Sequence, residues 1–151
     1  MAIGTDSSIE FFGTQDTVTS SSSAVTDGSF SVSGDITTWT NDDDAAGAAV
    51  VFEGTYSTAP DANSTVTLYA RLLNVQSTND QDAPDSNFNH YPLGVFPLND
   101  VTSAQYVVIK VPLPNTKTSQ EYEFYIQNNG GQTLSAGWDL YVTPVSIGPH
   151  P

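Results

Sequence analysis

Cysteine is absent from the 151 residues, and lysine and arginine together number only three. Without cysteine the chain has no disulfide, zinc-thiolate site or thiol nucleophile, so its stability must rest on packing. The 17 acids leave a net charge of −14. This balance argues against nucleic-acid and anionic-membrane partners, because lysine and arginine are the residues that bind phosphates. No apolar run approaches the length needed to span a membrane.

The opening Met1-Ala2-Ile3-Gly4-Thr5 lacks the basic region and apolar run of a secretory signal. We therefore expect synthesis in the cytoplasm, with any release following assembly or lysis. The length suits one domain. The pattern predicts an extended N-terminal arm over residues 1–28, a β-domain over residues 29–147 and a C-terminal tail over residues 148–151.

The clearest pattern covers residues 119–147, where apolar and polar residues alternate on both sides of Asn128-Asn129-Gly130-Gly131. Period-two alternation predicts two strands, each with one buried face. We expect these strands to form a hairpin, with Tyr122 opposite Trp138 in the core. A three-residue loop is favoured over a two-residue one, because it sets apolar residues opposite one another.

Other strands are predicted along the chain, with no helical periodicity of useful length. The apolar stretches 48–57 and 104–113 predict central strands, residues 65–75 a long half-buried strand, and the Pro-bounded residues 93–98 an edge strand. Even strand spacing with Gly, Pro and Asn turns predicts an all-β fold. We expect an antiparallel β-sandwich, most simply a jelly roll, with an immunoglobulin-like sandwich as the alternative.

Sequence motifs for catalysis are missing. The only histidines are His90 and His150, and no nucleophile elbow, phosphate loop or zinc-protease motif occurs. The acids Glu53 and Glu123 alternate with apolar neighbours, which predicts solvent-facing side chains rather than a glycosidase pair. We therefore predict no enzyme, no catalytic residue and no cofactor.

Two acidic segments are weighed as cation sites. Residues 42–44 are three adjacent aspartates whose side chains point in different directions, whereas Asp80, Asp82 and Asp85 are spaced so that one loop could wrap an ion. A solvated acidic loop is the favoured reading of both, so no metal is predicted. The loop 76–92 is the longest unpatterned stretch and is expected to meet a partner.

Three tyrosines fall on the polar sides of predicted strands. Tyr69, Tyr125 and Tyr141 would form either a ligand face or a subunit interface, and the apolar run at residues 48–52 favours the interface.

The sequence as a whole resembles small virion proteins of tailed bacteriophages. The resemblance rests on the Met-Ala-Ile-Gly-Thr opening, the Ser/Thr-rich arm, the acidic low-lysine composition and the ending Ser-Ala-Gly-Trp-Asp-Leu-Tyr-Val-Thr-Pro. It implies a non-enzymatic virion protein, foremost a capsid decoration (cement) protein that stabilises the head by subunit contacts. It also implies a homotrimer, whose further partners are the major capsid protein or other virion proteins.

The predicted contact residues are apolar or aromatic and lie in the arm and the long loop: Ile3, Ile9, Phe11, Phe12, Phe88, His90 and Tyr91. The alternative functions are a tail fibre or adaptor component and a receptor (carbohydrate)-binding module. A glycan would use Trp39, Tyr91 and the Asp80 to Asp85 loop.

Overall fold

The computed structural model describes residues 8–19, 22–87 and 92–149, with the side chain of Pro149 excepted. The described chain is all β, apart from one short 3-10 helix, η1 (Ser33–Asp35). The strands are β1 (Ser8–Phe12), β2 (Asp16–Thr17), β3 (Trp39–Asn41), β4 (Gly47–Gly54), β5 (Thr65–Leu73), β6 (Pro92–Pro97), β7 (Gln105–Pro112), β8 (Gln120–Asn129) and β9 (Asp139–Pro149).

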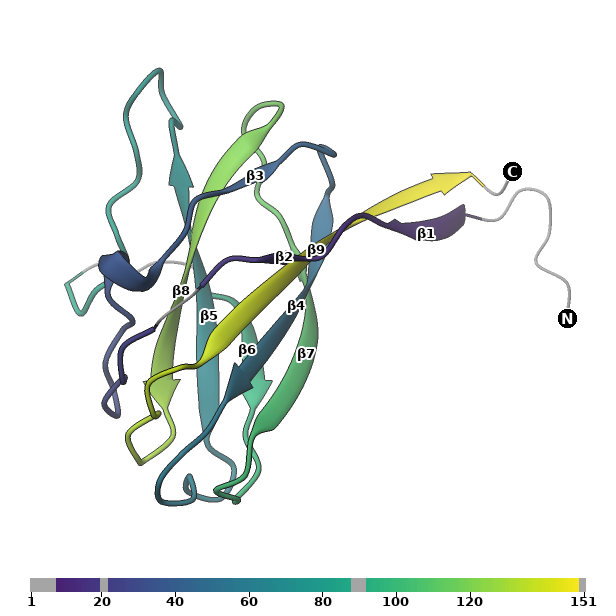
Figure 1. Cartoon of the computed structure of the whole chain (residues 1–151). Helices are drawn as coiled ribbons and strands as arrows, with labels where there is room; N and C mark the ends of the chain where they lie inside the picture. Colours follow the sequence, from purple (N-terminus) through teal and green to yellow (C-terminus); the bar gives the residue numbers. More distant parts are fainter. Residues whose placement is uncertain (1–7, 20–21, 88–91, 150–151) are drawn as a thin grey trace, which may run out of the picture.

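Two antiparallel sheets pack against each other (Figure 1). The first sheet has the order β1-β9-β4-β7, with β2 also paired to β9, and the second has the order β3-β8-β5-β6. From β2 to β9 the chain changes sheet at every connection except β5 to β6. This alternation between two sheets is the jelly roll, and it distinguishes the fold from the immunoglobulin-like sandwich, whose consecutive strands more often share a sheet.

The core lies between the sheets and is formed by alternate residues of each strand. In β5, for example, Val66, Leu68, Ala70 and Leu72 face inward. The largest buried side chain is Trp138, which enters the core just before β9 and donates from Nε1 to the Ser23 carbonyl at 2.8 Å. The predicted strand at 65–75 and the predicted edge strand at 93–98 are therefore confirmed as β5 and β6.

The predicted hairpin over residues 119–147 is wrong in its pairing. β8 is present with Tyr122, Phe124 and Ile126 buried, and β9 with Leu140 and Val142 buried, but β8 lies in the second sheet and β9 in the first. The second strand also begins only at Asp139, so residues 134–138 are not part of it, and Ala136 is exposed. Between them Leu134 bridges Val25 and Tyr56 instead of pairing with Ile126. Alternation shows which face of a strand is buried, but it does not specify which strand lies alongside.

Three further expectations need correction. β7 is an edge strand of the first sheet, not a central one, whereas β4 is central between β7 and β9. Val18 and Val25 are buried in the core, so the extended part of the predicted arm is confined to the residues before β2. β9 continues to Pro149, so residues 148 and 149 of the predicted tail belong to a strand.

Candidate functional site

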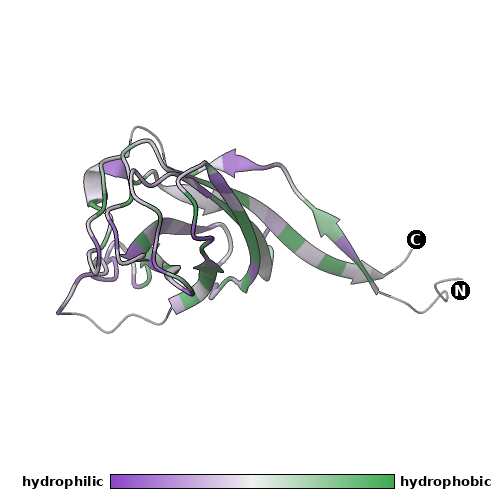
Figure 2. Ribbon diagram, turned by 90° about the horizontal axis from the view of Figure 1, so that it is seen from below, coloured by the Kyte–Doolittle hydropathy of each residue, from purple (hydrophilic) through white to green (hydrophobic). Residues whose placement is uncertain are grey.

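A two-stranded ribbon projects from the body of the sandwich. The pairing of β4 with β9 ends at Gly47 opposite Val145, and beyond it β9 pairs only with β1, from Phe12 opposite Val145 to Ser8 opposite Pro149. Figures 1 and 2 show the two strands leaving the body side by side. We call residues 8–12 and 145–149 the projecting ribbon.

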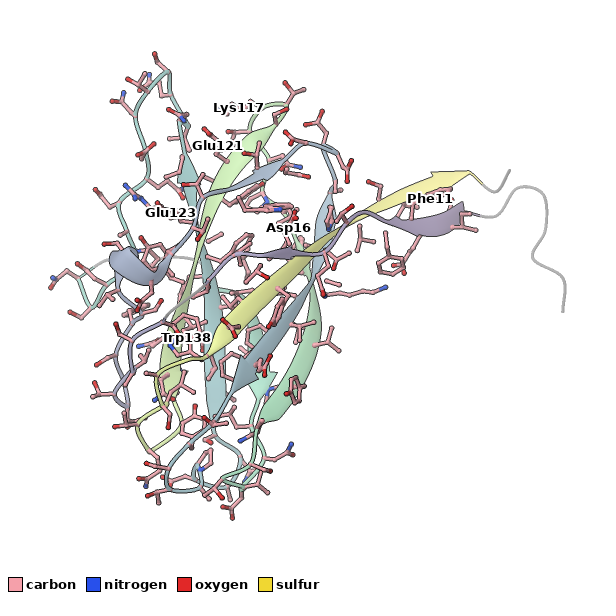
Figure 3. The ribbon with its side chains drawn as sticks, in the orientation of Figure 1. Phe11, Asp16, Lys117, Glu121, Glu123 and Trp138 are labelled. Atoms are coloured by element: carbon pink, nitrogen blue, oxygen red, sulfur yellow. The ribbon has the colours of Figure 1, made fainter. Side chains whose placement is uncertain are left out.

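The ribbon carries exposed apolar side chains on both faces. Because directly opposed residues share a face, Phe11 and Ile9 lie with Ser146 and Gly148 on one side. This side continues the core-facing side of β9, beyond the part that the second sheet covers, and Phe11 is 47% exposed. Figure 3 shows Phe11 on the ribbon, away from the body, and Trp138 within it.

The other face of the ribbon holds Phe12 and Ile147, which are 56% and 73% exposed. Here Lys110 of β7 reaches across to the ribbon, where its ammonium pairs with Glu10 and lies 5.3 Å from the centre of the Phe12 ring. A hollow of about 300 Å³ lies beside this contact, lined among others by Val111, Val145 and Ile147. The ribbon thus has one acid, and that acid is neutralised by a lysine of the body.

Two glycines allow the ribbon its close contacts. A Cβ on Gly148 would lie 2.9 Å from the Phe11 ring, so the ring packs directly over the backbone of the neighbouring strand. A Cβ on Gly13 would lie 2.5 Å from Asp43 and 2.6 Å from Pro144. Gly13, directly after β1, therefore lets the backbone pack closely against Asp43 and Pro144 of the body.

Three of the predicted contact residues, Ile9, Phe11 and Phe12, lie on this ribbon. Ile3, Phe88, His90 and Tyr91 lie outside the described residues. The sequence reasoning missed two contributors, Ile147 and Lys110. Past Pro144 the apolar residues Val145 and Ile147 alternate with Ser146 and Gly148, in the opposite phase to Leu140 and Val142. This second alternation is a signal that could have revealed a strand running beyond the body, with its apolar residues on the other face.

The predicted glycan platform is not formed by Trp39. This side chain is only 6% exposed, its ring centre lies 5.9 Å from those of Tyr122 and Phe124, and its Nε1 donates to Asp16 at 2.9 Å. Trp39 is therefore a core residue, and Tyr91 lies outside the described residues.

The acids of the long loop are used to hold that loop. Asp80 accepts from the Asn74 amide at 2.8 Å and lies 3.6 Å from Arg71, and Asp85 accepts from the Asn87 amide at 2.6 Å. Arg71 also pairs with Glu123 at 2.8 Å, the surface ion pair that a lone arginine on a strand suggests. Within the described ranges no three metal-ligating side chains come together.

The three predicted outward tyrosines are divided between two sides of the molecule. Tyr69 and Tyr125 are directly opposed in the second sheet, whereas Tyr141 belongs to the first. Tyr125 is also only 1% exposed, and burial together with the neighbouring Glu123 raises its pKa to about 12. A single tyrosine face is therefore not formed.

Glu53 and Glu123 are likewise separated by the sandwich, because β4 and β8 belong to different sheets. The acid that faces Glu53 is Asp139, its direct partner across β4 and β9. Partial burial, and then the charge of Glu53, raise the pKa of Asp139 above its usual value. Tyr141 donates to Glu53 at 3.2 Å, so this group is a hydrogen-bonded surface cluster.

A second hollow, of about 480 Å³, opens beside Leu72, Leu93 and Leu113 and has several proline side chains in its wall. Its described lining has no titratable side chain. It offers apolar volume but none of the groups that acid-base or nucleophilic chemistry requires.

No helix in the described part of the chain is long and apolar enough to cross a membrane. The projecting ribbon, which carries exposed apolar side chains on both faces, is therefore taken as the candidate functional site. Neither the models of known protein families nor the curated proteins contain a match to this chain.

Proposed function

We propose that the chain is a non-enzymatic structural subunit of a virus particle, a decoration (cement) protein on the capsid of a tailed bacteriophage. Its partners would be other copies of itself and the major capsid protein, and it would be located in the virion. The virus assignment rests on the sequence resemblance, and the mode of action rests on the jelly-roll body with its projecting ribbon.

The observation that carries the proposal is the exposure of Phe11, Phe12 and Ile147 on a ribbon outside the body. An isolated two-stranded ribbon is at best marginally stable in water, and apolar groups on both faces gain stability only when another surface covers them. Removing the exposed parts of these three side chains from water would contribute about 3 kcal/mol per copy. Repeated over a shell, such a contribution holds neighbouring subunits together.

The charge of the molecule fits this role. A net charge of −14 keeps free copies apart and soluble, and two of the three bases, Arg71 and Lys110, are already paired within the chain. Specific contact would therefore be made through the neutralised ribbon, not through the acidic body.

The test is the copy number in purified virions and its dependence on the ribbon. Mass spectrometry should find the chain at a level comparable to that of the major capsid protein. A level of a few copies per particle would instead indicate a tail fibre or adaptor, and absence from the particle would refute the proposal.

Recombinant protein added to particles that lack the chain gives the matched comparison. The double variant Phe11→Ser, Phe12→Ser should fail to bind while its sandwich remains folded. Tyr106→Ser removes a 68% exposed aromatic from β7 of the body and should bind as wild type does. Equal binding by all three proteins would show that the ribbon is not the contact.

A further inference from the structure

We infer that the outer edge of β1 pairs with β1 of a second copy, in antiparallel register about a two-fold axis. The inference rests on the proposed function in taking the ribbon as the contact, and it names the first partner as the chain itself. The two-fold pair would replace the trimer that the resemblance implies. The resulting sheet would run without interruption from one body into the other.

The backbone of β1 shows which groups are open. In an antiparallel sheet the N–H and C=O of successive residues point to opposite edges. The amides of Gly13 and Val18 donate to the carbonyls of Pro144 and Leu140, so the even-numbered residues of β9 face the β1 side. Their partners in β1 are Ile9, opposite Gly148, and Phe11, opposite Ser146.

Ser8, Glu10 and Phe12 therefore direct their backbone groups away from β9. No strand of the described chain pairs with this edge, because β1 is the last strand of its sheet. These three alternate residues offer three N–H and three C=O groups to a neighbouring strand, the pattern that strand addition uses. A two-fold axis at Glu10 pairs all of them: Glu10 with its counterpart, and Ser8 with Phe12 in both directions.

Charge identifies the occupant as a second copy. The pairing would bring two Glu10 side chains close together, which would be repulsive if both were free. Each Glu10, however, is bonded to a Lys110 ammonium of its own chain, so the junction contains two acids and two bases. The same axis places Ile9 opposite Phe11 of the other copy, which covers apolar side chains on the ribbon.

A positively charged strand of another protein would find fewer unpaired acids along this edge than on the body. Of the 17 acids, Glu10 is the single one on the described ribbon, and it is already neutralised. The edge consequently suits a strand that is apolar apart from a neutralised acid, which is what β1 of another copy provides.

The first test is the oligomeric state of the purified full chain by analytical ultracentrifugation over a concentration series. A dimer is expected. Raising the salt concentration should strengthen it, because salt screens the repulsion between two bodies of charge −14. A monomer at all concentrations overturns the inference, and a trimer does so too.

The second test separates the outward N–H from the side chain. Glu10→Pro removes the open donor at a position where an edge strand tolerates proline, and Glu10→Ala removes only the carboxylate. The proline variant should dissociate at least about tenfold more readily than the alanine variant. Equal dissociation constants would show that the β1 edge is not the contact.

A third comparison leaves the backbone unchanged. Lys110→Ala exposes two facing Glu10 carboxylates and should weaken the dimer about tenfold. Adding Glu10→Gln should restore it, because the repulsion then disappears, whereas no restoration would contradict the two-fold pairing. A monomeric chain that still binds particles would refute this inference alone, and a dimer absent from virions would refute only the proposed function.

Discussion

Asn128 ties the end of β8 to three other parts of the chain, and its replacement by alanine is the sharpest test of the fold. Its Oδ1 accepts from the Tyr56 hydroxyl at 2.9 Å and from the Gly130 amide at 3.0 Å. Its Nδ2 donates to the carbonyls of Val25 and Gln132, both at 2.8 Å. The side chain itself is fully buried.

The magnitude follows from the partners that Asn128→Ala leaves behind. The bonds to Tyr56, Gly130 and Val25 are buried, so these three groups would lose a partner without gaining water. A stranded buried polar group costs about 1–3 kcal/mol, and we expect a total loss of about 4 kcal/mol. Against a domain stability of about 5–15 kcal/mol, this would lower the urea midpoint substantially.

Urea unfolding followed by the fluorescence of buried Trp138 and Trp39 measures the loss. Tyr56→Phe is the control, because it removes one donor and leaves Asn128 bonded to its other three partners; we expect it to cost about 1 kcal/mol. If Asn128→Ala proved no more costly than this control, the network would not be what holds the β8 end in place.

Three other predictions concern ionisable side chains. Arg71→Met should cost about 1–2 kcal/mol in urea unfolding and speed proteolysis within residues 74–87, because it removes the 2.8 Å pair with Glu123 and the 2.6 Å bond to the Gln81 carbonyl; an unchanged cleavage rate would contradict this. Burial raises the pKa of Tyr122 from 10.0 to about 12, so the unfolded chain ionises first and stability falls by about 1.4 kcal/mol per pH unit across that interval. Tyr122→Phe should unfold with a shallower alkaline slope, and identical slopes would argue against burial as the cause. Because the pKa of Asp139 is raised, the stability of the wild type should decline relative to that of Asp139→Asn as pH rises above 3.8. A difference in melting temperature between the two proteins that stays constant from pH 3 to 7 would contradict this.

The strands and their buried faces could be predicted from the sequence because they depend on local alternation. Residues 65–75 predict one long half-buried strand, and the structure shows β5 with Val66, Leu68 and Leu72 in the core. Trp138 is likewise predicted in the core and is buried there. The all-β class and the antiparallel sandwich are predicted from strand spacing and turn residues, and both are confirmed. The jelly roll is separated from the immunoglobulin-like alternative only by the strand order of the two sheets.

Strand partners could not be predicted, because they depend on contacts between distant residues. The hairpin predicts Tyr122 opposite Trp138, yet its partners in the sheet are Trp39 of β3 and Leu72 of β5. The glycines after β8 fit a hairpin loop equally well, but Gly131 and Gly137 have positive φ angles and help the chain to cross between the sheets. The bonds of Asn128 to Val25 and Tyr56 were not visible in any local pattern.

The candidate site was found only in part for the same reason. Phe11 and Phe12 stand out in sequence because they are adjacent aromatics in a polar arm. That Lys110 lies over the Phe12 ring, and that Ile147 lies beside Glu10, depends on strands far apart in the chain coming together. Only the tertiary fold brings these residues into contact.

The pairing of Ser8 with Pro149 has a practical consequence for anyone who engineers this protein. Residues fused before Ser8 or after Pro149 would both emerge at the tip of the ribbon and crowd whatever it touches. The turn at residues 61–63, between β4 and β5, is exposed and lies at the other end of β4 from Gly47, where the ribbon departs. A peptide or fluorophore for display is therefore better inserted there than attached to either terminus.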